Sequence, residues 1–565
     1  MKEKITGAEA LMRSLENEGV DVMFGYPGGA IMPTFDALYD HRKTLNHILV
    51  RHEQAAAHAA QGYARVSGKV GVCLVTSGPG VTNTITGIAD AMMDSTPIVV
   101  IAGQVGAAFL GTDAFQEVDL VGVTQPISKW AYQIRRPEDV AWAVSRAFYI
   151  ASTGRPGPVV LDFAKNAQVG MVEYEPQHID FIRGYVPVPD IDPVAVSEAA
   201  KMINAAKKPL VLVGQGVELG GAQSELRQLI ETADMPAGCT LLGLSALPSD
   251  HRLNMGMLGM HGSLASNVKT QECDLLIAVG MRFDDRITGK LATYATQAKK
   301  IHFDIDPSEI NKNVKVDLAV LGNCKDTLAQ VNKLINKNSH TDWIESFNPY
   351  KEKERTVVIE KEIHPTEGPI KMGEVVDTVT RQTGNQAIMV TDVGQNQMMA
   401  ARYFKFTKNR SVVTSGGMGT MGFGTPAGIG AAFGAPDRNV CVFLGDGGLQ
   451  MTIQELGTIM ENQVPVKLIL LNNNYLGNVR QWQAMFFNRR YSFTPMTNPD
   501  FMKIAEAYRI PCQTVIDRKD LAAAVRTMMD TKGPYLLQVA VEEEGNVMPM
   551  CAPGHDVDDM VLEFK

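Results

Sequence analysis

Two short polar segments decide the fold class, Gly445-Asp446-Gly447-Gly448 and Asn472-Asn473-Asn474. Each directly follows an apolar run, residues 440–444 and 466–471 respectively. Continuous apolar runs of this kind are typical of parallel strands that helices cover on both faces. Because parallel strands end at one edge of a sheet, we expect the two polar segments to lie side by side.

The chemistry of these two segments suits a diphosphate held through magnesium. The glycines let the backbone approach a diphosphate closely, while Asp446 and Asn473 offer hard oxygen ligands. Mg²⁺ takes few protein ligands and completes its shell with phosphate oxygens and water. Either segment alone is a common turn sequence, so it is their spacing after two buried strands that favours a site. The arrangement resembles the diphosphate-binding motif of thiamine-diphosphate enzymes.

The same pattern of an apolar run followed by a Gly-rich turn recurs along the chain. At 565 residues the chain is too long for one core, and about three or four domains are expected. Apolar runs, Gly-rich turns and helical periodicity repeat in 1–170, 190–335 and 370–550, and polar linkers are expected at 171–189 and 336–369. The further strand-like runs are 70–75, 98–102, 159–162, 209–213, 275–279, 301–305 and 387–390. We therefore predict an α/β protein of three doubly wound domains with mainly parallel sheets, the architecture of thiamine-diphosphate enzymes.

Composition excludes several classes of protein. Hydrophobic residues make up 45% and charged residues 20%, as in ordinary globular proteins. A net charge of −9 disfavours a nucleic-acid partner. The seven scattered cysteines indicate reduced thiols rather than disulfides or a zinc site. No apolar run reaches the roughly 18 residues of a membrane span and no signal segment is evident, so we expect a cytoplasmic protein without a membrane partner.

The thiamine-diphosphate family implies an activating carboxylate in the first domain. Glu53 follows the apolar run 48–50 and opens a helical stretch at 55–64. A Glu at that position is by itself favoured by the helix dipole. With the Gly-rich segments 25–30 and 76–80 nearby, it is similar to the Glu that shares a proton with a ring nitrogen of the cofactor.

Motifs spread over almost the whole chain narrow the resemblance. They are GTDAFQE at 111–117, STGRPGP at 152–158, LGMHG at 258–262, RFDDR at 282–286, TGK at 288–290 and GFG at 422–424. Any one of them could be loop or packing sequence. Together, in this order, they resemble the large, catalytic subunits of the acetolactate synthase (acetohydroxyacid synthase) family.

This resemblance implies a transferase. Pyruvate would be decarboxylated on thiamine diphosphate, and the hydroxyethyl carbanion would pass to a second 2-oxo acid, pyruvate or 2-oxobutanoate. The products would be 2-acetolactate or 2-aceto-2-hydroxybutanoate, in branched-chain amino-acid biosynthesis. The alternatives are another thiamine-diphosphate-dependent decarboxylase, oxidase or carboligase, and a non-catalytic binding subunit. Arg286 and Trp482 argue against a plain decarboxylase, and Glu53 argues against glyoxylate carboligase.

The resemblance also assigns residues by position. The catalytic and substrate-contacting set is Glu53, Phe115, Gln116, Lys165, Arg286 and Trp482. Thiamine diphosphate would contact Gly28, Gly29, Ala30, Gly394, Gln395, Asn396, Gly419, Met421, Gly445, Gly447 and Gly448, with Met421 bending the cofactor. Mg²⁺ would be held by Asp446, Asn473 and the carbonyl of Tyr475. The planar fork of Arg286 suits the carboxylate of the second 2-oxo acid, and Trp482 would favour 2-oxobutanoate over pyruvate.

FAD and the oligomeric state follow from the resemblance alone. A structural, non-redox FAD would contact Arg155, Gly214, Gly216, Thr240, Leu241, Leu258, Gly259, Met260, His261, Gly280, Arg282, Asp284, Asp304, Ile305 and Asn323. One active site could be assembled within a chain or across two. The family assembles it across two, which implies a homodimer with active sites at the subunit interface. A tetramer and a small regulatory subunit are further candidate assemblies for this chain.

The chain departs from the family pattern near the expected sites. Gly106-Ala107-Ala108 stands where Pro-Arg-Arg is usual, and Asn396 and Asn478 replace a usual His and Met. Asn323 replaces an expected Asp, and Gln215 lies at the centre of a glycine run. The first and third changes bear on substrate access and acceptor choice, the last two on FAD affinity. None removes a chemical role.

Overall fold

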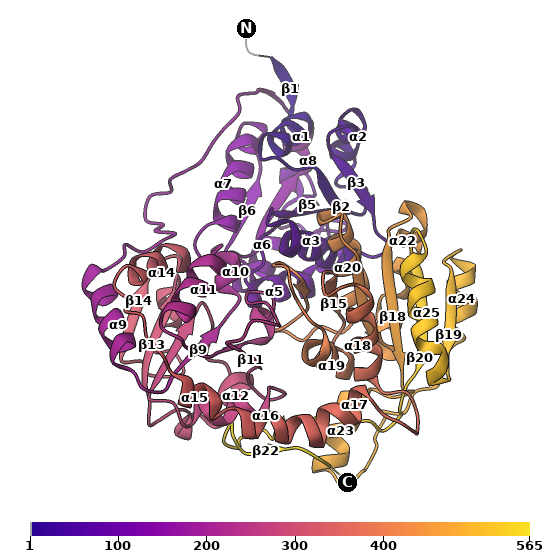
Figure 1. Cartoon of the computed structure of the whole chain (residues 1–565). Coiled ribbons are helices and arrows are strands. Elements are labelled where there is room, and N and C mark those ends of the chain that lie inside the picture. Colours follow the sequence, from indigo (N-terminus) through magenta and orange to yellow (C-terminus); the bar gives the residue numbers. More distant parts are fainter. Residues whose placement is uncertain (1–2, 565) are drawn as a thin grey trace.

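Residues 3–564 are described by a computed structural model, which contains three six-stranded parallel sheets. Figure 1 shows the first domain at the top, the second at the lower left and the third on the right. The nine apolar runs expected to be strands all lie in these sheets. The predicted fold class is therefore confirmed.

The first domain has the sheet order β3-β2-β4-β5-β7-β6. Its strands are β2 (Val22–Gly25), β3 (Asn46–Leu49), β4 (Gly71–Val75), β5 (Ile98–Gln104), β6 (Trp130–Ile134) and β7 (Val159–Ala164), and β1 (Lys4–Thr6) pairs with β8 (Met171–Glu173). Its helices are α1 (Gly7–Asn17), α2 (Met32–His41), α3 (Glu53–Ser67), α4 (Pro79–Thr82), α5 (Ile85–Met93), α6 (Leu120–Thr124), α7 (Val140–Ser152) and α8 (Lys165–Val169). Helices α1 and α7 bury one face of the sheet and α3 and α5 the other, as the doubly wound prediction requires.

The second domain has the order β11-β10-β9-β12-β13-β14. Its strands are β9 (Pro209–Val213), β10 (Ala237–Cys239), β11 (Asn254–Met257), β12 (Leu275–Val279), β13 (Lys299–Asp304) and β14 (Leu318–Leu321). Its helices are α9 (Pro193–Ala205), α10 (Gly216–Leu219), α11 (Gln223–Thr232), α12 (Leu264–Thr270), α13 (Asp285–Thr288) and α14 (Cys324–Asn332). The expected linker 336–369 is largely helical, with α15 (Thr341–Glu345), α16 (Asn348–Glu354), the π-helix η7 (Arg355–Ile359) and α17 (Glu360–Ile363). Its Trp343 and Phe347 are buried against the second sheet, while the exact domain boundaries stay a prediction.

The third domain has the order β16-β15-β17-β18-β20-β19. Its sheet strands are β15 (Ile388–Thr391), β16 (Val412–Val413), β17 (Val440–Gly445), β18 (Val466–Asn472), β19 (Cys512–Val515) and β20 (Tyr535–Ala540). Its helices are α18 (Met372–Gln382), α19 (Gln395–Tyr403), α20 (Gly424–Gly434), α21 (Asp446–Met451), the 3₁₀-helix η8 (Ile453–Glu455), α22 (Leu456–Asn462), α23 (Gly477–Phe486), α24 (Phe501–Ala507) and α25 (Arg518–Asp530). A terminal hairpin of β21 (Met550–Cys551) and β22 (Met560–Val561) lies against the second domain, where the Cys551 amide donates to the Met260 carbonyl at 2.8 Å.

Helices α3 and α20 join the first and third domains through small residues, and they lie side by side in Figure 1. A Cβ at Gly62 would lie 2.0 Å from the Ala427 carbonyl oxygen, and one at Gly430 would lie 1.8 Å from that of Ala59. The distance between packed helices depends on the side chains at their contact. Glycine at these two positions therefore lets the backbones touch, which fixes the orientation of the two domains.

Within residues 3–564, no helix is both long and apolar enough to cross a membrane.

Candidate functional site

The carboxyl edge of the third sheet brings Asp446 and Asn473 to one small pocket. Strands β17 and β18 are parallel neighbours, with Gly445 opposite Leu471, so their polar ends emerge side by side. Asp446 is 1% exposed and Asn473 is 3% exposed. Burial raises the pKa of the Asp446 carboxyl, while the hydrogen bond from Asn498 acts in the opposite direction.

Asn498 holds this edge together. Its side-chain Nδ2 lies 2.7 Å from Asp446 Oδ2, 3.0 Å from Asn472 Oδ1 and 3.1 Å from Asn474 Oδ1, and its two hydrogens are shared among these oxygens. One amide group thus ties the tip of β17 to the tip of β18. Asn498 could not be predicted from the sequence, because it lies in a loop without periodicity and its partners are distant in sequence.

Asp392, which follows β15, hydrogen-bonds the backbone of the loops around the same pocket. It is 0% exposed, and its carboxylate accepts bonds from the amides of Val393 at 2.8 Å, Gly422 at 3.0 Å and Gly424 at 2.9 Å. A Cβ at Gly448 would lie 2.4 Å from Asp392 Oδ1, which explains why glycine stands there. Asp392 therefore holds the loop that carries Met421 against the start of α21.

Most of the residues expected to contact the diphosphate and the metal line this one pocket. They are Gly394, Gln395, Asn396, Met421, Gly445, Asp446, Gly447, Gly448, Asn473 and Tyr475. Asn473 Nδ2 lies 3.4 Å from Gln395 Oε1, and Asn396 Nδ2 donates to the Phe443 carbonyl at 3.0 Å. Gly419 lies apart from this set, in the larger cavity described below.

In the first domain, Glu53 is the first residue of α3 and is half-buried. Its Oε2 accepts a hydrogen bond from Asn83 Nδ2 at 2.9 Å. Thr76 and Ser77, in the loop after β4, have buried hydroxyls with no hydrogen-bond partner among residues 3–564. A Cβ at Gly80 would lie 3.5 Å from Glu53 Oε1 and 2.6 Å from Thr76 Cγ2, so these groups share one small region. Unpaired buried hydroxyls beside a carboxylate are typical of a place that a polar ligand completes.

The other predicted residues of the first domain lie at the same sheet edge. Gly28, Gly29 and Ala30 follow β2, and a Cβ at Gly28 would lie 2.5 Å from Thr76. Gln116 has a positive φ of 61°, and its Cβ would lie 2.9 Å from one added at Gly78. Phe115 is 87% exposed, and Lys165 is an exposed residue at the start of α8.

A cavity of about 1330 Å³ lies between the three domains. Its lining includes thirteen residues expected at FAD: Arg155, Gly216, Thr240, Leu241, Leu258, Met260, His261, Gly280, Arg282, Asp284, Asp304, Ile305 and Asn323. The predicted contacts Gly214 and Gly259 do not line it. A Cβ at Gly214 would lie 2.1 Å from the Gly280 carbonyl oxygen, so that glycine permits close packing of strand ends. Asn323 also caps α14, where its side chain accepts from the Lys325 amide at 2.9 Å.

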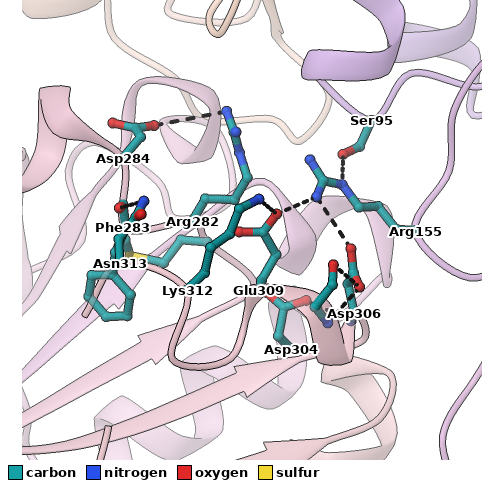
Figure 2. Close-up of polar contacts among 12 residues, drawn as sticks. Ser95, Arg155, Arg282, Phe283, Asp284, Asp304, Asp306, Glu309, Lys312 and Asn313 are labelled. Carbon is teal, nitrogen blue, oxygen red and sulfur yellow. Dashed lines mark hydrogen bonds and ion pairs between the residues drawn. The ribbon is translucent and has the colours of Figure 1, made fainter. Parts of the chain in front are cut away.

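Arg155 is bound by acidic groups at the rim of this cavity (Figure 2). Its guanidinium lies 2.7 Å from Glu309 Oε1 and 3.3 Å from Asp306 Oδ2, and its Nε donates to Ser95 Oγ at 2.8 Å. Lys312 lies 3.0 Å from the same Glu309 oxygen. Arg155 thus links the first domain to the second.

Arg286 and Trp482, the two predicted acceptor residues, line the same large cavity. Arg286 lies in α13, whose N-terminus Asp284 caps by accepting from the amides of Arg286 at 3.0 Å and Ile287 at 3.2 Å. Burial raises the pKa of Asp284, and Arg282 opposes that effect. Trp482 lies in α23 and packs edge-on against Phe486, with ring centroids 5.4 Å apart.

The structure thus brings together two groups of predicted residues and keeps a third apart. The large cavity and the small pocket share Asn478 and Val479, so the predicted acceptor and diphosphate sites are contiguous. Neither cavity is lined by Glu53, Phe115, Gln116 or Lys165.

Fold and site together define a thiamine pyrophosphate enzyme. The families described as the thiamine pyrophosphate enzyme N-terminal TPP binding domain, central domain and C-terminal TPP binding domain match residues 5–123, 196–331 and 392–539. The chain belongs, within that class, to the acetolactate synthase large-subunit family. It is 43% identical to the acetolactate synthase isozyme 2 large subunit of Escherichia coli, over 99% of this chain and 100% of that protein. It is also 43% identical to a probable acetolactate synthase large subunit of Methanocaldococcus jannaschii (99% and 95% covered) and 44% identical to the acetolactate synthase large subunit of Parasynechococcus marenigrum (99% and 91% covered).

Proposed function

We propose that this chain condenses two 2-oxo acids with loss of CO₂. Two pyruvates would give 2-acetolactate, and pyruvate with 2-oxobutanoate would give 2-aceto-2-hydroxybutanoate. The observation that carries this proposal is the similarity to acetolactate synthase large subunits over almost the whole chain. Bound thiamine diphosphate supplies the electron sink for decarboxylation and for carbon–carbon bond formation.

The protein's own contribution begins with proton transfer at Glu53. In the proposal, its carboxyl shares a proton with a ring nitrogen of the cofactor, and Asn83 keeps that carboxyl in place through its 2.9 Å hydrogen bond. The unpaired hydroxyls of Thr76 and Ser77 support a polar ligand beside Glu53. Gln116 and Lys165, at the same sheet edge, would contact the first substrate, with Phe115 as an apolar wall.

The diphosphate pocket fits a hydrated Mg²⁺. Asp446 offers a carboxylate, Asn473 an amide oxygen and Tyr475 a backbone carbonyl, which are the hard oxygens this ion prefers. The buried Oδ1 of Asn478, at the same pocket, has no partner among residues 3–564. Gly447 supports a close approach of the diphosphate, since a Cβ there would lie 2.7 Å from Leu476 Cδ2.

The large cavity supports two further assignments. Arg286 would pair with the carboxylate of the second 2-oxo acid, and Trp482 would shape the space for its alkyl group. The cavity is lined by residues of all three domains, and its His261 has a buried Nδ1 without a partner among residues 3–564. These features support FAD held as a structural group by the thirteen lining residues named above.

We further propose a homodimer in which each active site takes Glu53 from one chain and Asp446 from the other. The separation of the Glu53 group from both cavities supports this arrangement, as does the exposure of large apolar side chains. Phe115 is 87% exposed and Phe493 is 96% exposed, and covering such apolar side chains with a partner surface would be favourable. Because the relatives are named large subunits, a small regulatory subunit is a candidate partner, and a tetramer is a further candidate assembly.

Product analysis tests the proposed function. The purified chain is incubated with pyruvate, thiamine diphosphate and Mg²⁺, with and without FAD. We expect 2-acetolactate and CO₂. Acetaldehyde would indicate a decarboxylase instead, acetate with peroxide would indicate an oxidase, and absence of any product would revive the non-catalytic alternative.

A further inference from the structure

The turn that presents Glu53 is held by a buried carboxylate of the third domain. Glu455 is the last residue of η8 and is 0% exposed. The Arg51 amide donates to its Oε1 at 3.0 Å and lies 3.2 Å from its Oε2. The backbone of His52 also lies close enough to lower the pKa of this carboxyl, against the effect of burial. Glu455 therefore holds the backbone of Arg51, two residues before Glu53.

The segment around Glu455 holds the preceding strand end too. Thr458 Oγ1 lies 2.7 Å from Glu455 Oε2 and 3.3 Å from the Leu49 carbonyl oxygen at the end of β3. Arg51 Nη1 donates to that same carbonyl at 3.0 Å, and Arg51 Nη2 pairs with Glu461 at 2.8 Å. Glu455 and Thr458 thus hold the backbone of the β3–α3 turn, whereas the half-exposed Glu461 contacts only the side chain of Arg51.

Burying a carboxylate at this position costs free energy, because the charged form loses its hydration. Burial raises the pKa of Glu455 to about 7, against the bonds from Thr458 and Arg51 that favour the charged form. A neutral side chain would avoid that desolvation cost. In its ionised form, which predominates above a pKa of about 7, the carboxylate accepts shorter and stronger hydrogen bonds than a neutral side chain would. It then holds the Arg51 amide more firmly than an uncharged residue could.

The backbone of residues 51 and 52 leads directly into Glu53, the predicted catalytic residue. His52 is the N-cap of α3, where its Nδ1 accepts from the Gln54 amide at 3.2 Å, and Glu53 is the first helical residue. A shift of the 51–52 backbone therefore moves the Glu53 side chain directly. Asn83 fixes only the far end of that side chain.

We propose that Glu455 is a positioning residue, which holds the 51–52 backbone so that Glu53 meets the cofactor ring in the productive geometry. The inference rests on the proposed function, in which Glu53 exchanges a proton with the cofactor. With this role the third domain would contribute both to the diphosphate pocket and to the turn that precedes Glu53. The stretch that begins with Asp446 at the diphosphate pocket ends with Glu455 at the Glu53 turn, so one segment sets both places.

The test compares Glu455→Gln with Glu461→Gln in the full-length protein with thiamine diphosphate and Mg²⁺. Both variants remove one carboxylate near Arg51. Glu455 accepts from the Arg51 backbone amide, whereas Glu461 contacts only the Arg51 guanidinium. We expect Glu455→Gln to lower kcat by roughly 10- to 100-fold with little change in KM for pyruvate, since small misplacements of a reacting group cost about that much. Glu461→Gln should leave both constants near wild type.

Hydrogen–deuterium exchange supplies a readout that activity does not. Amides of residues 50–54 should exchange faster in Glu455→Gln and at the wild-type rate in Glu461→Gln, whereas exchange in α21 should stay unchanged. Thr458→Val, which removes one supporting hydroxyl, should shift kcat and exchange in the same direction by a smaller amount. It also serves if Glu455→Gln fails to fold.

Two outcomes would overturn the inference. One is a Glu455→Gln enzyme with wild-type kcat and exchange, and the other is a loss of kcat without faster exchange at 50–54. Glu53→Gln, measured alongside, separates this result from the proposed function. If Glu53→Gln still forms 2-acetolactate at the normal rate, the proposed function fails; if it is inactive while Glu455→Gln behaves as wild type, only the positioning role fails.

Discussion

In the first domain the predicted cofactor and substrate residues are half-buried or exposed at the sheet edge, whereas in the third domain several of them are buried. Phe115 is 87% exposed, but Asp446 is 1% exposed and is already held by Asn498. Both domains use the same doubly wound architecture, and both place their polar groups at the carboxyl ends of parallel strands. The difference teaches that most of the predicted diphosphate residues already line one pocket within a single chain, whereas the predicted groups around Glu53 line neither cavity.

The largest effect is expected from Glu53→Gln, which removes the predicted catalytic carboxylate of the first domain. Acetolactate formation should fall by about 10²- to 10⁴-fold, because general acid–base catalysis contributes about that much. Thiamine diphosphate affinity, measured by titration, should change little. The exposed Glu138→Gln is the control. Near-normal turnover by Glu53→Gln would remove Glu53 from the chemistry.

Asp446→Asn removes the buried carboxylate of the predicted metal site in the third domain. Loss of a metal-binding carboxylate should weaken Mg²⁺-dependent binding of thiamine diphosphate by roughly 10- to 100-fold, the range seen when metal sites are perturbed. Titration of the cofactor at several Mg²⁺ concentrations measures this, with the exposed Asp437→Asn as the control. An unchanged Mg²⁺ dependence would place the metal elsewhere.

Mixing the two inactive variants sharpens the comparison. If each active site takes Glu53 and Asp446 from different chains, a hybrid dimer has one site with both defects and one intact site. Co-refolded Glu53→Gln and Asp446→Asn should then regain acetolactate formation. If every mixture stays inactive although hybrid dimers form, both residues serve a site from the same chain.

A smaller effect is expected where the two domains meet. Gly430→Ala would push a Cβ to 1.8 Å from the Ala59 carbonyl oxygen, so α20 and α3 must separate. Overpacking of this kind costs about 1–3 kcal/mol of stability, which a lowered melting temperature should report. Gly106→Ala is the matched control, because its Cβ would meet nothing nearer than Phe109 at 3.9 Å. Equal melting temperatures for the two variants would contradict the close packing.

An effect no larger than that of Gly430→Ala is expected from a change of pH. The pKa of Glu455 is raised from 4.5 to about 7 by burial, so its contribution to folding stability is present at low pH and is lost as pH rises between these values. Glu455→Gln cannot ionise and should lose nothing there. Its melting temperature relative to wild type should therefore improve between pH 5 and pH 8, by the equivalent of about 1–3 kcal/mol at most. A constant difference across that range would show that Glu455 does not titrate as its burial indicates.

Local sequence predicted much of this molecule because its strands are short, apolar and parallel. Continuous apolar runs indicated strands buried on both faces, and strand ends then placed Asp446 beside Asn473 without reference to any other part of the chain. The position of Glu53 at a helix start was also predicted from the neighbouring residues and is found there. The roles assigned to these residues stay predictions.

The contacts that hold these sites together could not be predicted in the same way. Asn498 lies in a loop without periodicity, and Glu455 reaches Arg51 across 404 positions of sequence. The expected linker 336–369 buries Trp343 and Phe347, although its composition is that of a polar connection. Hydrophobic periodicity reports that a side chain is buried, but it does not report which distant element covers it.

The sequence by itself therefore determined the class of fold, the edge at which each polar motif lies and the family to which the motifs belong, because these depend on local burial and on residue order. Only the tertiary structure decided that Glu455 grips the turn before Glu53, that Asp392 supports the Met421 loop, and that the Glu53 group stands apart from both cavities. Those facts depend on how whole domains pack, and the packing is set by surfaces that are far apart in the chain.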